Sequence, residues 1–304
     1  MSRNFVEGIW RLADPKISIT SAAGMLIAFS YAYREGACSW SWLAATAVSL
    51  FGFEVAKNAW GDVIDYDSGT DLAVKEEDRT AFSGGKRVLV EGLLTRAQTW
   101  GVAGVFVSAG ILFGLAIVFL REPKALWLGL VGAALAWSYQ GPPLKLAYRG
   151  LGELAVALSY GPVVVLGTYL VQTGRLDWDV FWLSLPLGLL IAAFLWVNEF
   201  PDHDADKSSG KSNLVVRLGK KNAAKGLAAI YGFSFIVTAS FPFLLDIELY
   251  PLCGLFSWGF PLAVLVMVLR SPEDFYRSKP VQPLALLGFV LYSVEVAVGL
   301  LMAL

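Results

Sequence analysis

Residues 97–120 read AQTWGVAGVFVSAGILFGLAIVFL, and no charged side chain interrupts them. A helix needs about 20 apolar residues to cross the roughly 30 Å hydrocarbon core of a membrane, and this stretch is long enough. Because backbone groups in lipid must be hydrogen-bonded within the protein, a helix is the expected structure for such a segment. The stretch therefore predicts a transmembrane helix.

Apolar segments of similar length fill most of the chain. Eight more are uncharged or hold a single charge, and they span residues 17–33, 36–53, 125–144, 154–174, 180–198, 226–245, 249–269 and 281–304. Charged residues make up only 16% of the chain, whereas a soluble domain usually carries about 25%. No alternating pattern typical of a membrane β-barrel occurs. We therefore predict an all-α, polytopic membrane protein with nine transmembrane helices.

The charges of the loops predict the orientation. If the N-terminus is cytoplasmic, 20 of the 24 basic residues fall on the cytoplasmic side, as the positive-inside rule requires. We expect a multi-pass protein of the cell membrane whose N-terminus is cytoplasmic and whose C-terminus is outside. The N-terminus shows no signal-peptide cleavage pattern, so the first span is expected to stay. Two long loops, about 62–96 and about 199–225, then cap the cytoplasmic face.

The rare residue types exclude several kinds of site. Two cysteines, Cys38 and Cys253, cannot form a disulfide scaffold or a zinc cluster. The single histidine, His203, excludes a His-rich metal site and is interpreted as a solvated turn residue. A net charge of −1 gives no reason to expect nucleic-acid binding.

A weak internal repeat links two helix ends. The second span ends in N58-A-W-G-D62 and the sixth in N198-E-F-P-D202, and each leads into a long charged loop. Duplicated halves often place a binding site at their interface. We predict one domain over residues 1–304 with two four-helix halves and a ninth span, at about 17–144, about 151–270 and 281–304.

The first helix end opens an acidic cluster that reads G61-D-V-I-D-Y-D-S-G-T-D71. Asp62 and Asp65 are three residues apart and therefore share a helical face, with Asn58 one turn earlier. Gly69 permits a turn that brings Asp71 back toward them. The cluster predicts several carboxylates at one helix end.

The second helix end carries a matching cluster, N198-E-F-P-D-H-D-A-D206. Asn198, Asp202 and Asp206 recur every four residues and lie on one face if the helix continues, whereas Asp204 points elsewhere. Pro201 is expected to kink or end that helix.

Two sets of carboxylates that face each other repel unless cations separate them. The donors are oxygens, which suit Mg²⁺, an ion usually bound by a few carboxylates together with substrate phosphates. The alternative is that these acids cap helices or pair with loop lysines. Basic residues surround both clusters and indicate an anionic substrate such as a diphosphate; they are Arg79, Lys86, Arg87, Lys145, Lys211 and Arg217.

At these residues the chain resembles the UbiA superfamily of intramembrane prenyltransferases. The family's first motif, N-D-x-x-D with a further Asp, matches residues 61–65 and Asp71, and its second, D-x-x-x-D, matches Asp202 and Asp206. The family's motif Asn falls on Gly61, and Asn58 is a candidate to replace it. Other segments are similar to the family's Tyr/Pro/Lys segment or to its dihydroxynaphthoate branch; they are S138-Y-Q-G-P-P-L-K145, F82-S-G-G, V88-L-V-E-G-L-L, G150-L-G-E, D206-K-x-x-G-K211 and R217-L-G.

The resemblance implies nine helices around a central cavity and transfer of a polyprenyl group from polyprenyl diphosphate to an acceptor, with release of diphosphate. The implied Mg²⁺ ligands are Asp62, Asp65, Asp202 and Asp206. The residues implied to bind or neutralise the substrate are Asp71, Arg79, Lys145, Lys211, Asn58 and Asn198. Tyr139 is the best aromatic candidate to face a reactive carbocation.

The acceptor and the protein class leave alternatives. The favoured acceptor is 1,4-dihydroxy-2-naphthoate, as in menaquinone biosynthesis, and 4-hydroxybenzoate and geranylgeranylglyceryl phosphate remain alternatives. A cation-coupled secondary transporter is the alternative from another class, although the acids gather at one membrane face rather than at the midplane. A CDP-alcohol phosphotransferase is disfavoured because its D-G-x-x-A-R core is absent. Glu54 is a candidate to line the acceptor pocket, and Glu295 is expected to be a buried, hydrogen-bonded residue.

Overall fold

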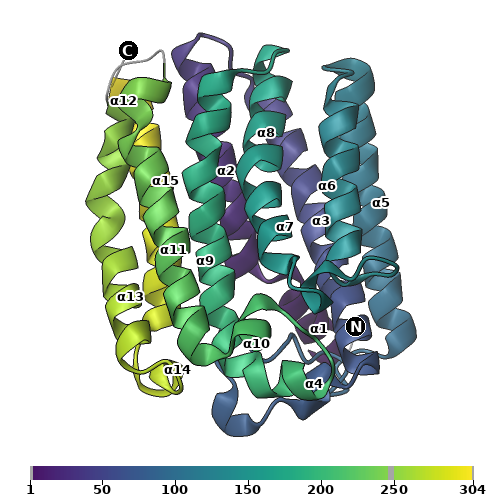
Figure 1. Ribbon diagram of the computed structural model, residues 1–304. Coiled ribbons are helices and arrows are strands. Elements are labelled where there is room, and N and C mark those ends of the chain that lie inside the picture. Colours follow the sequence, from purple (N-terminus) through teal and green to yellow (C-terminus); the bar gives the residue numbers. More distant parts are fainter. Residues whose placement is uncertain (1–2, 246–249, 303–304) are drawn as a thin grey trace.

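The computed structural model describes residues 3–245 and 250–302, and every regular element within these ranges is helical, as predicted. The long helices stand side by side in a bundle (Figure 1). In chain order they are α2 (Pro15–Arg34), α3 (Trp40–Asp67), α5 (Arg96–Leu120), α6 (Ala125–Gln140), α7 (Gly152–Leu158) continued by η3 (Ser159–Val163) and α8 (Val164–Thr173), α9 (Trp178–Ser208), α11 (Lys220–Ala239), η4 (Tyr250–Trp258) continued by α13 (Gly259–Arg270), and α15 (Val281–Met302).

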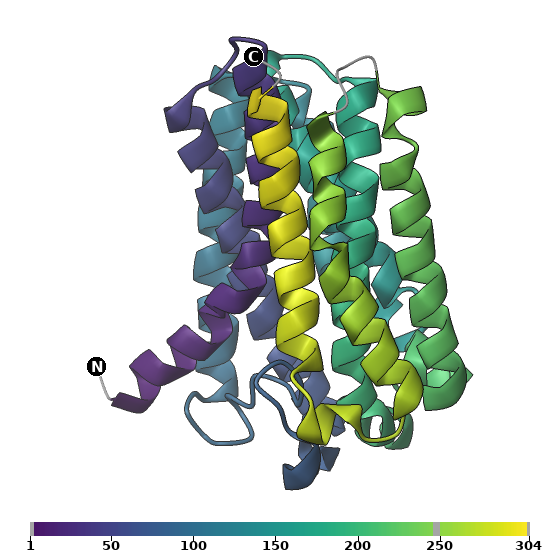
Figure 2. The ribbon, with the colours of Figure 1, turned by 90° about the vertical axis from the view of Figure 1, so that its left-hand side faces the viewer.

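Short helices and the longest connections gather at one end of the bundle, which we call the loop end. They include α4 (Thr70–Ala73), η1 (Glu76–Asp78), η2 (Leu146–Tyr148), α10 (Leu214–Leu218) and α14 (Phe275–Ser278). Helix α1 (Arg3–Ala13) leaves this end obliquely, whereas the C-terminal end of α15 and α12 (Phe241–Leu244) lie at the opposite end (Figures 1 and 2). Both acidic clusters lie at the loop end, because α3 and α9 each finish there.

Each predicted span coincides with one helix or with two or three consecutive helices, although residues 249, 303 and 304 lie outside the described part of the chain. Five described helices are long and apolar enough to cross a membrane; they are Arg96–Leu120, Gly152–Thr173, Trp178–Ser208, Pro251–Arg270 and Val281–Met302. Helix α6 is not among them because it has only 16 residues. The structure therefore supports a multi-pass membrane protein.

Helix α9 is continuous through Pro201, so the expectation that this proline ends the helix is wrong. Proline removes one backbone donor, but packing on both sides of it holds the helix together. Val197 and Phe200 are fully buried, and the Phe200 ring lies 5.1 Å from that of Phe275 in α14. The polar face of α9 therefore continues beyond the proline.

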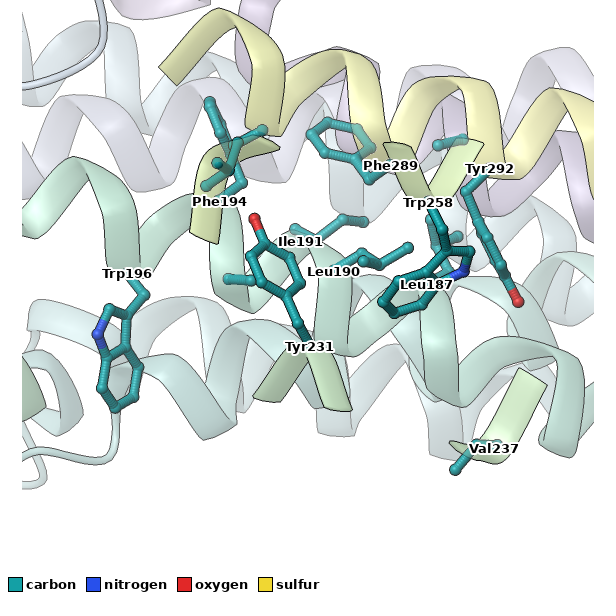
Figure 3. Close-up of a cluster of buried hydrophobic side chains, with 14 of the residues drawn as sticks. Leu187, Leu190, Ile191, Phe194, Trp196, Tyr231, Val237, Trp258, Phe289 and Tyr292 are labelled. Carbon is teal, nitrogen blue, oxygen red and sulfur yellow. The ribbon is translucent and has the colours of Figure 1, made fainter. Parts of the chain in front are cut away.

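A large apolar core fixes α9 against α11, η4 and α15. In Figure 3, Leu187 and Phe194 of α9 lie among Trp258, Phe289 and Tyr292. The rings of Phe194 and Phe289 are 5.6 Å apart. Because lipid is as apolar as these side chains, close packing rather than exclusion of water holds such helices together. The core thus sets the position of the second acidic cluster.

Glycines let α3 and α5 approach closely. A β-carbon at Gly52 would lie 2.8 Å from the backbone nitrogen of Gly110, which is closer than real side chains permit. The Ser49 hydroxyl donates a 2.8 Å hydrogen bond to the Gly110 carbonyl at the same crossing. Small residues and interhelical hydrogen bonds are typical of helix contacts in membranes. This contact fixes α3, which carries the first acidic cluster.

Candidate functional site

Two neighbouring cavities occupy the interior between the long helices. A polar cavity of about 740 Å³ lies at the loop end, lined by the ends of α3 and α9 and by the connection after α3. An apolar cavity of about 840 Å³ lies between α3, α5, α6, α7 and α8. Lys57 and Tyr139 line both, and the Lys57 Nζ atom lies 4.7 Å from the centre of the Tyr139 ring. The two cavities therefore meet at this pair.

The polar cavity gathers all of the site residues nominated from sequence except Lys145. They are Asn58, Asp62, Asp65, Asp71, Arg79, Tyr139, Asn198, Asp202, Asp206 and Lys211. The Lys145 ammonium instead lies 5.3 Å from the Tyr148 ring, outside the cavity lining. Its backbone is in the left-handed region, with φ of 46°, at the start of the short helix η2. Tyr148 in turn contacts Asp65, and the role of Lys145 at the substrate stays a prediction.

The carboxylates of α3 are both buried and differ in what they contact. Asp62 accepts hydrogen bonds from the backbone N–H groups of Val88 and Leu89, at 3.2 and 3.1 Å, so it holds the long connection over the site. Asp65 accepts from Gln140 Nε2 at 2.7 Å and from the Tyr148 hydroxyl at 2.6 Å. Each carboxylate oxygen has two lone pairs, so these bonds leave acceptor capacity on both groups.

Asp71 returns to the cavity through the turn that Gly69 permits. Gly69 has φ of 83° and precedes α4, in which Asp71 is almost fully buried. Burial, together with the nearby charge of Asp65, raises the pKa of Asp71 to about 8. A carboxyl with such a pKa is largely protonated at neutral pH, and a bound cation would favour its ionised form.

The second cluster presents one polar face of α9. Asn198, Asp202 and Asp206 line the cavity, whereas Asp204 is exposed and pairs with His203, as their spacing predicted. Asp206 is 2% exposed and accepts a 2.7 Å hydrogen bond from Asn213 Nδ2.

Lys211 connects the two clusters. Its Nζ atom lies 3.4 Å from Asp65 Oδ2 and 3.6 Å from Asp206 Oδ1, so these oxygens are no farther apart than the sum of the two distances. Burial lowers the pKa of Lys211, but the charges of Asp206 and Asp65 outweigh this effect and raise it well above its ordinary value. The ammonium group therefore stays charged and partly neutralises both helix ends.

The donors at this site fit a hard divalent cation. Three buried oxygens that accept no hydrogen bond belong to residues lining the cavity, and they are Asn198 Oδ1, Asp202 Oδ1 and Asp206 Oδ1. A buried acceptor without a partner is costly, and a cation would satisfy it. Within residues 3–245 and 250–302, no three acidic, histidine or cysteine side chains are already arranged as a metal site.

Several predicted residues have structural partners. Asn58 Nδ2 donates to the Leu12 carbonyl at 2.9 Å and ties α1 to α3, and Arg79 donates to the Val74 carbonyl at 3.3 Å. Glu295 is half-buried and accepts the Ser257 N–H at 2.9 Å, which confirms its expected hydrogen-bonded environment. Glu54 lines the apolar cavity and accepts a 2.6 Å hydrogen bond from the Ser21 hydroxyl.

The sequence did not single out four residues that complete the site, namely Lys57, Gln140, Tyr148 and Asn213. Gln140 and Tyr148 hold Asp65, and Asn213 holds Asp206. Lys57 could have been noticed, because it follows an uncharged stretch, residues 36–53, and stands one residue before Asn58. The other three come from different helices and gave no local signal.

Comparison with known proteins identifies the family of the chain. The model of the UbiA prenyltransferase family matches residues 19–293. A UbiA prenyltransferase domain-containing protein 1 from Dictyostelium discoideum is 31% identical over 86% of this chain and 76% of its own length. A 1,4-dihydroxy-2-naphthoate octaprenyltransferase from Mycobacterium tuberculosis is 32% identical over 69% of this chain and 70% of its own length.

A solved structure shares the fold. A UbiA homologue from Archaeoglobus fulgidus bound to GPP and Mg²⁺ superimposes with a TM-score of 0.63, covering 96% of this chain and 99% of that one at 16% identity. The predicted resemblance is thus confirmed, and the transporter alternative is no longer needed. The chain belongs to the UbiA prenyltransferase family and is a membrane-embedded prenyltransferase.

Proposed function

We propose that this protein transfers a polyprenyl group from a polyprenyl diphosphate to 1,4-dihydroxy-2-naphthoate in the membrane, with Mg²⁺ and with release of diphosphate. The observation that carries the proposal is the junction of the two cavities at Lys57 and Tyr139. A substrate with a charged head and a long apolar tail needs a polar and an apolar chamber in contact. The acceptor is proposed from the relatives that are named for this naphthoate, such as the enzyme from Mycobacterium tuberculosis.

The residues present have the roles that this reaction requires. Asp65, Asp202, Asp206 and Asn198 would hold Mg²⁺, which supplies charge neutralisation for the departing diphosphate. Asp62 and Asp71 are close enough to contribute, and Asp62 also keeps the connection closed over the site. Lys211 and Arg79 would bind diphosphate oxygens.

The reacting carbon would lie near Tyr139. Cleavage of the allylic C–O bond leaves both bonding electrons on diphosphate and a positive charge on the prenyl carbon. The electron-rich face of an aromatic ring stabilises such a cation, and Tyr139 lies where the head and tail chambers join. The acceptor ring carbon then bonds to the prenyl carbon, and the ring regains its aromaticity by releasing the group that this carbon held, either a proton or, at the carboxylated carbon, CO2. Exclusion of water by the apolar walls prevents hydrolysis of the cation.

We also propose the membrane arrangement that the sequence predicts. All nine predicted spans would cross the bilayer, with the loop end and the N-terminus in the cytoplasm. The excess of basic residues on the loops of that end supports this orientation. The repeat Asn58–Asp62 and Asn198–Asp202 supports two related halves, since both segments border the same cavity.

The test is an assay of the purified protein in lipid with geranylgeranyl diphosphate, Mg²⁺ and a panel of acceptors, read by mass spectrometry. The panel contains 1,4-dihydroxy-2-naphthoate, 4-hydroxybenzoate and geranylgeranylglyceryl phosphate. We expect a prenylated naphthoquinol and loss of activity when EDTA removes Mg²⁺. A prenylated product from another acceptor only would overturn the naphthoate assignment, and full activity in EDTA would overturn the metal assignment.

The apolar cavity predicts control of prenyl chain length. Gly167 lines this cavity, and a β-carbon there would meet nothing within 4 Å. We expect Gly167→Trp to fill part of the cavity, so that long prenyl diphosphates lose at least about tenfold in kcat/KM relative to short ones, a difference of about 1.4 kcal/mol. Competition between geranyl and longer diphosphates, read by mass spectrometry, measures the ratio.

Gly232 offers a matched control for this prediction. It lies in α11, also has free space around its β-carbon position, and does not line the cavity. Gly232→Trp should leave the chain-length ratio unchanged. An unchanged ratio in Gly167→Trp would mean that the tail does not occupy this cavity.

A further inference from the structure

The side chain of Gln140 fills the space beside Asp65 that a side chain at Gly61 would otherwise take. A β-carbon at position 61 would lie 2.8 Å from Cδ of Gln140, and therefore within its carboxamide group. Gln140 is the last residue of α6, is 7% exposed, and lines the polar cavity. Only a glycine in α3 leaves room for this side chain to reach across from α6.

From this position Gln140 binds the carboxylate of Asp65. Gln140 Nε2 donates a 2.7 Å hydrogen bond to Asp65 Oδ2, and an ionised carboxylate can only accept, so the amide orientation follows from the chemistry. The same oxygen lies 3.4 Å from Lys211 Nζ, while Tyr148 binds the other oxygen. Asp65 is thus held at both oxygens by neutral donors, Gln140 at one and Tyr148 at the other.

Resting on the proposed function, we infer that Gln140 is a positioning residue that orients Asp65 toward the cation, and that Gly61 is required because it leaves the room for Gln140. Partners of ligating carboxylates fix their orientation, and removing such a partner typically costs about 10–100-fold in metal affinity or activity. A side chain at position 61 is one helical turn before Asp65 on the same face, so an amide placed there is next to Asp65 as well. In this protein the amide that hydrogen-bonds to Asp65 of α3 therefore comes from another helix, α6, instead of from position 61 of α3 itself.

Asn58 does not take this role. Its amide donates to the Leu12 carbonyl, which holds α1 rather than a carboxylate. The family's motif has an Asn where this chain has Gly61. The amide of Gln140, which comes from another helix, therefore replaces the amide of that Asn.

The experiment measures Mg²⁺ dependence in four variants, by kinetics and by the thermal shift that Mg²⁺ with inorganic diphosphate produces. Gln140→Ala should raise the half-maximal Mg²⁺ concentration about 10–100-fold in both measurements. Gly61→Ala should do the same, because the new methyl displaces Gln140, even though alanine favours a helix more than glycine does. The double variant Gly61→Ala/Gln140→Ala should be no worse than either single one, since both remove the same hydrogen bond.

The fourth variant tests directly whether an amide at position 61 can replace the amide of Gln140. Gly61→Asn/Gln140→Ala returns an amide to Asp65 from α3 and should restore the Mg²⁺ midpoint to within about threefold of the original protein. Gln172→Ala is the matched control, because Gln172 is also a buried glutamine, accepts a 2.6 Å hydrogen bond from Ser39 N–H, and lies far from the cavity. That variant should lower stability and leave the Mg²⁺ midpoint unchanged.

The outcomes separate this inference from the proposed function. An unchanged Mg²⁺ midpoint in Gln140→Ala, or additive losses in the double alanine variant, would overturn the positioning role. Such a result leaves the function intact if Asp65→Asn still abolishes Mg²⁺-dependent turnover. Full activity in Asp65→Asn would instead overturn the proposed site itself.

Discussion

Asp202→Asn should reduce prenyl transfer by at least about a thousandfold, which corresponds to roughly 4 kcal/mol of lost transition-state stabilisation. Asp202 Oδ1 is buried, lines the polar cavity and accepts no hydrogen bond, so this oxygen is free to bind a cation. The change keeps the shape of the side chain and removes the negative charge that a divalent cation requires. Turnover of geranylgeranyl diphosphate, measured beside the melting temperature, tests this expectation.

The same helix offers a control two residues away. Asp204 is exposed and contacts His203 rather than the cavity. Asp204→Asn should keep turnover within about twofold, because exposed charges of this kind contribute little. Equal activity in the two variants would show that Asp202 holds no metal. Loss of folding in Asp202→Asn would point to a structural role instead.

The sequence predicts those site residues whose relative positions follow from their spacing along a helix. Asp62 and Asp65, and likewise Asn198 and Asp202, lie on one face because they are three or four residues apart. The return of Asp71 follows from one glycine at Gly69. These relations are local, so the sequence alone is enough to find them.

Contacts between helices are not visible in the same way. Gln140 reaches Asp65 only because α6 ends beside Gly61, and this depends on how two helices pack. The motif predicts Lys145 at the substrate, whereas its position beside the Tyr148 ring depends on the fold around η2 and could not be predicted from spacing. Pro201 was expected to kink or end α9, and of these the ending is wrong, because tertiary packing keeps the helix continuous. Motif spacing predicts which residues share a face, and packing decides what that face meets.

Lys211→Met should lower both stability and activity, and the loss of stability should depend on Mg²⁺. The lysine is half-buried between Asp65 and Asp206, at 3.4 and 3.6 Å, and its removal leaves two carboxylates facing each other without a cation. Breaking a buried ion pair by removing one partner typically costs about 3–5 kcal/mol. In EDTA we therefore expect a clear drop in melting temperature relative to the original protein.

Addition of Mg²⁺ with inorganic diphosphate should restore part of that drop, because the divalent cation neutralises the same two carboxylates. Turnover should remain reduced by about a hundredfold, since the lysine that would bind the leaving diphosphate is still missing. Lys225→Met is the control, because Lys225 is exposed on α11 and lies outside the cavity lining. A melting temperature for Lys211→Met that is unchanged in EDTA would mean that Lys211 does not balance the two acidic helix ends. A drop that Mg²⁺ leaves untouched would mean that the cation binds elsewhere.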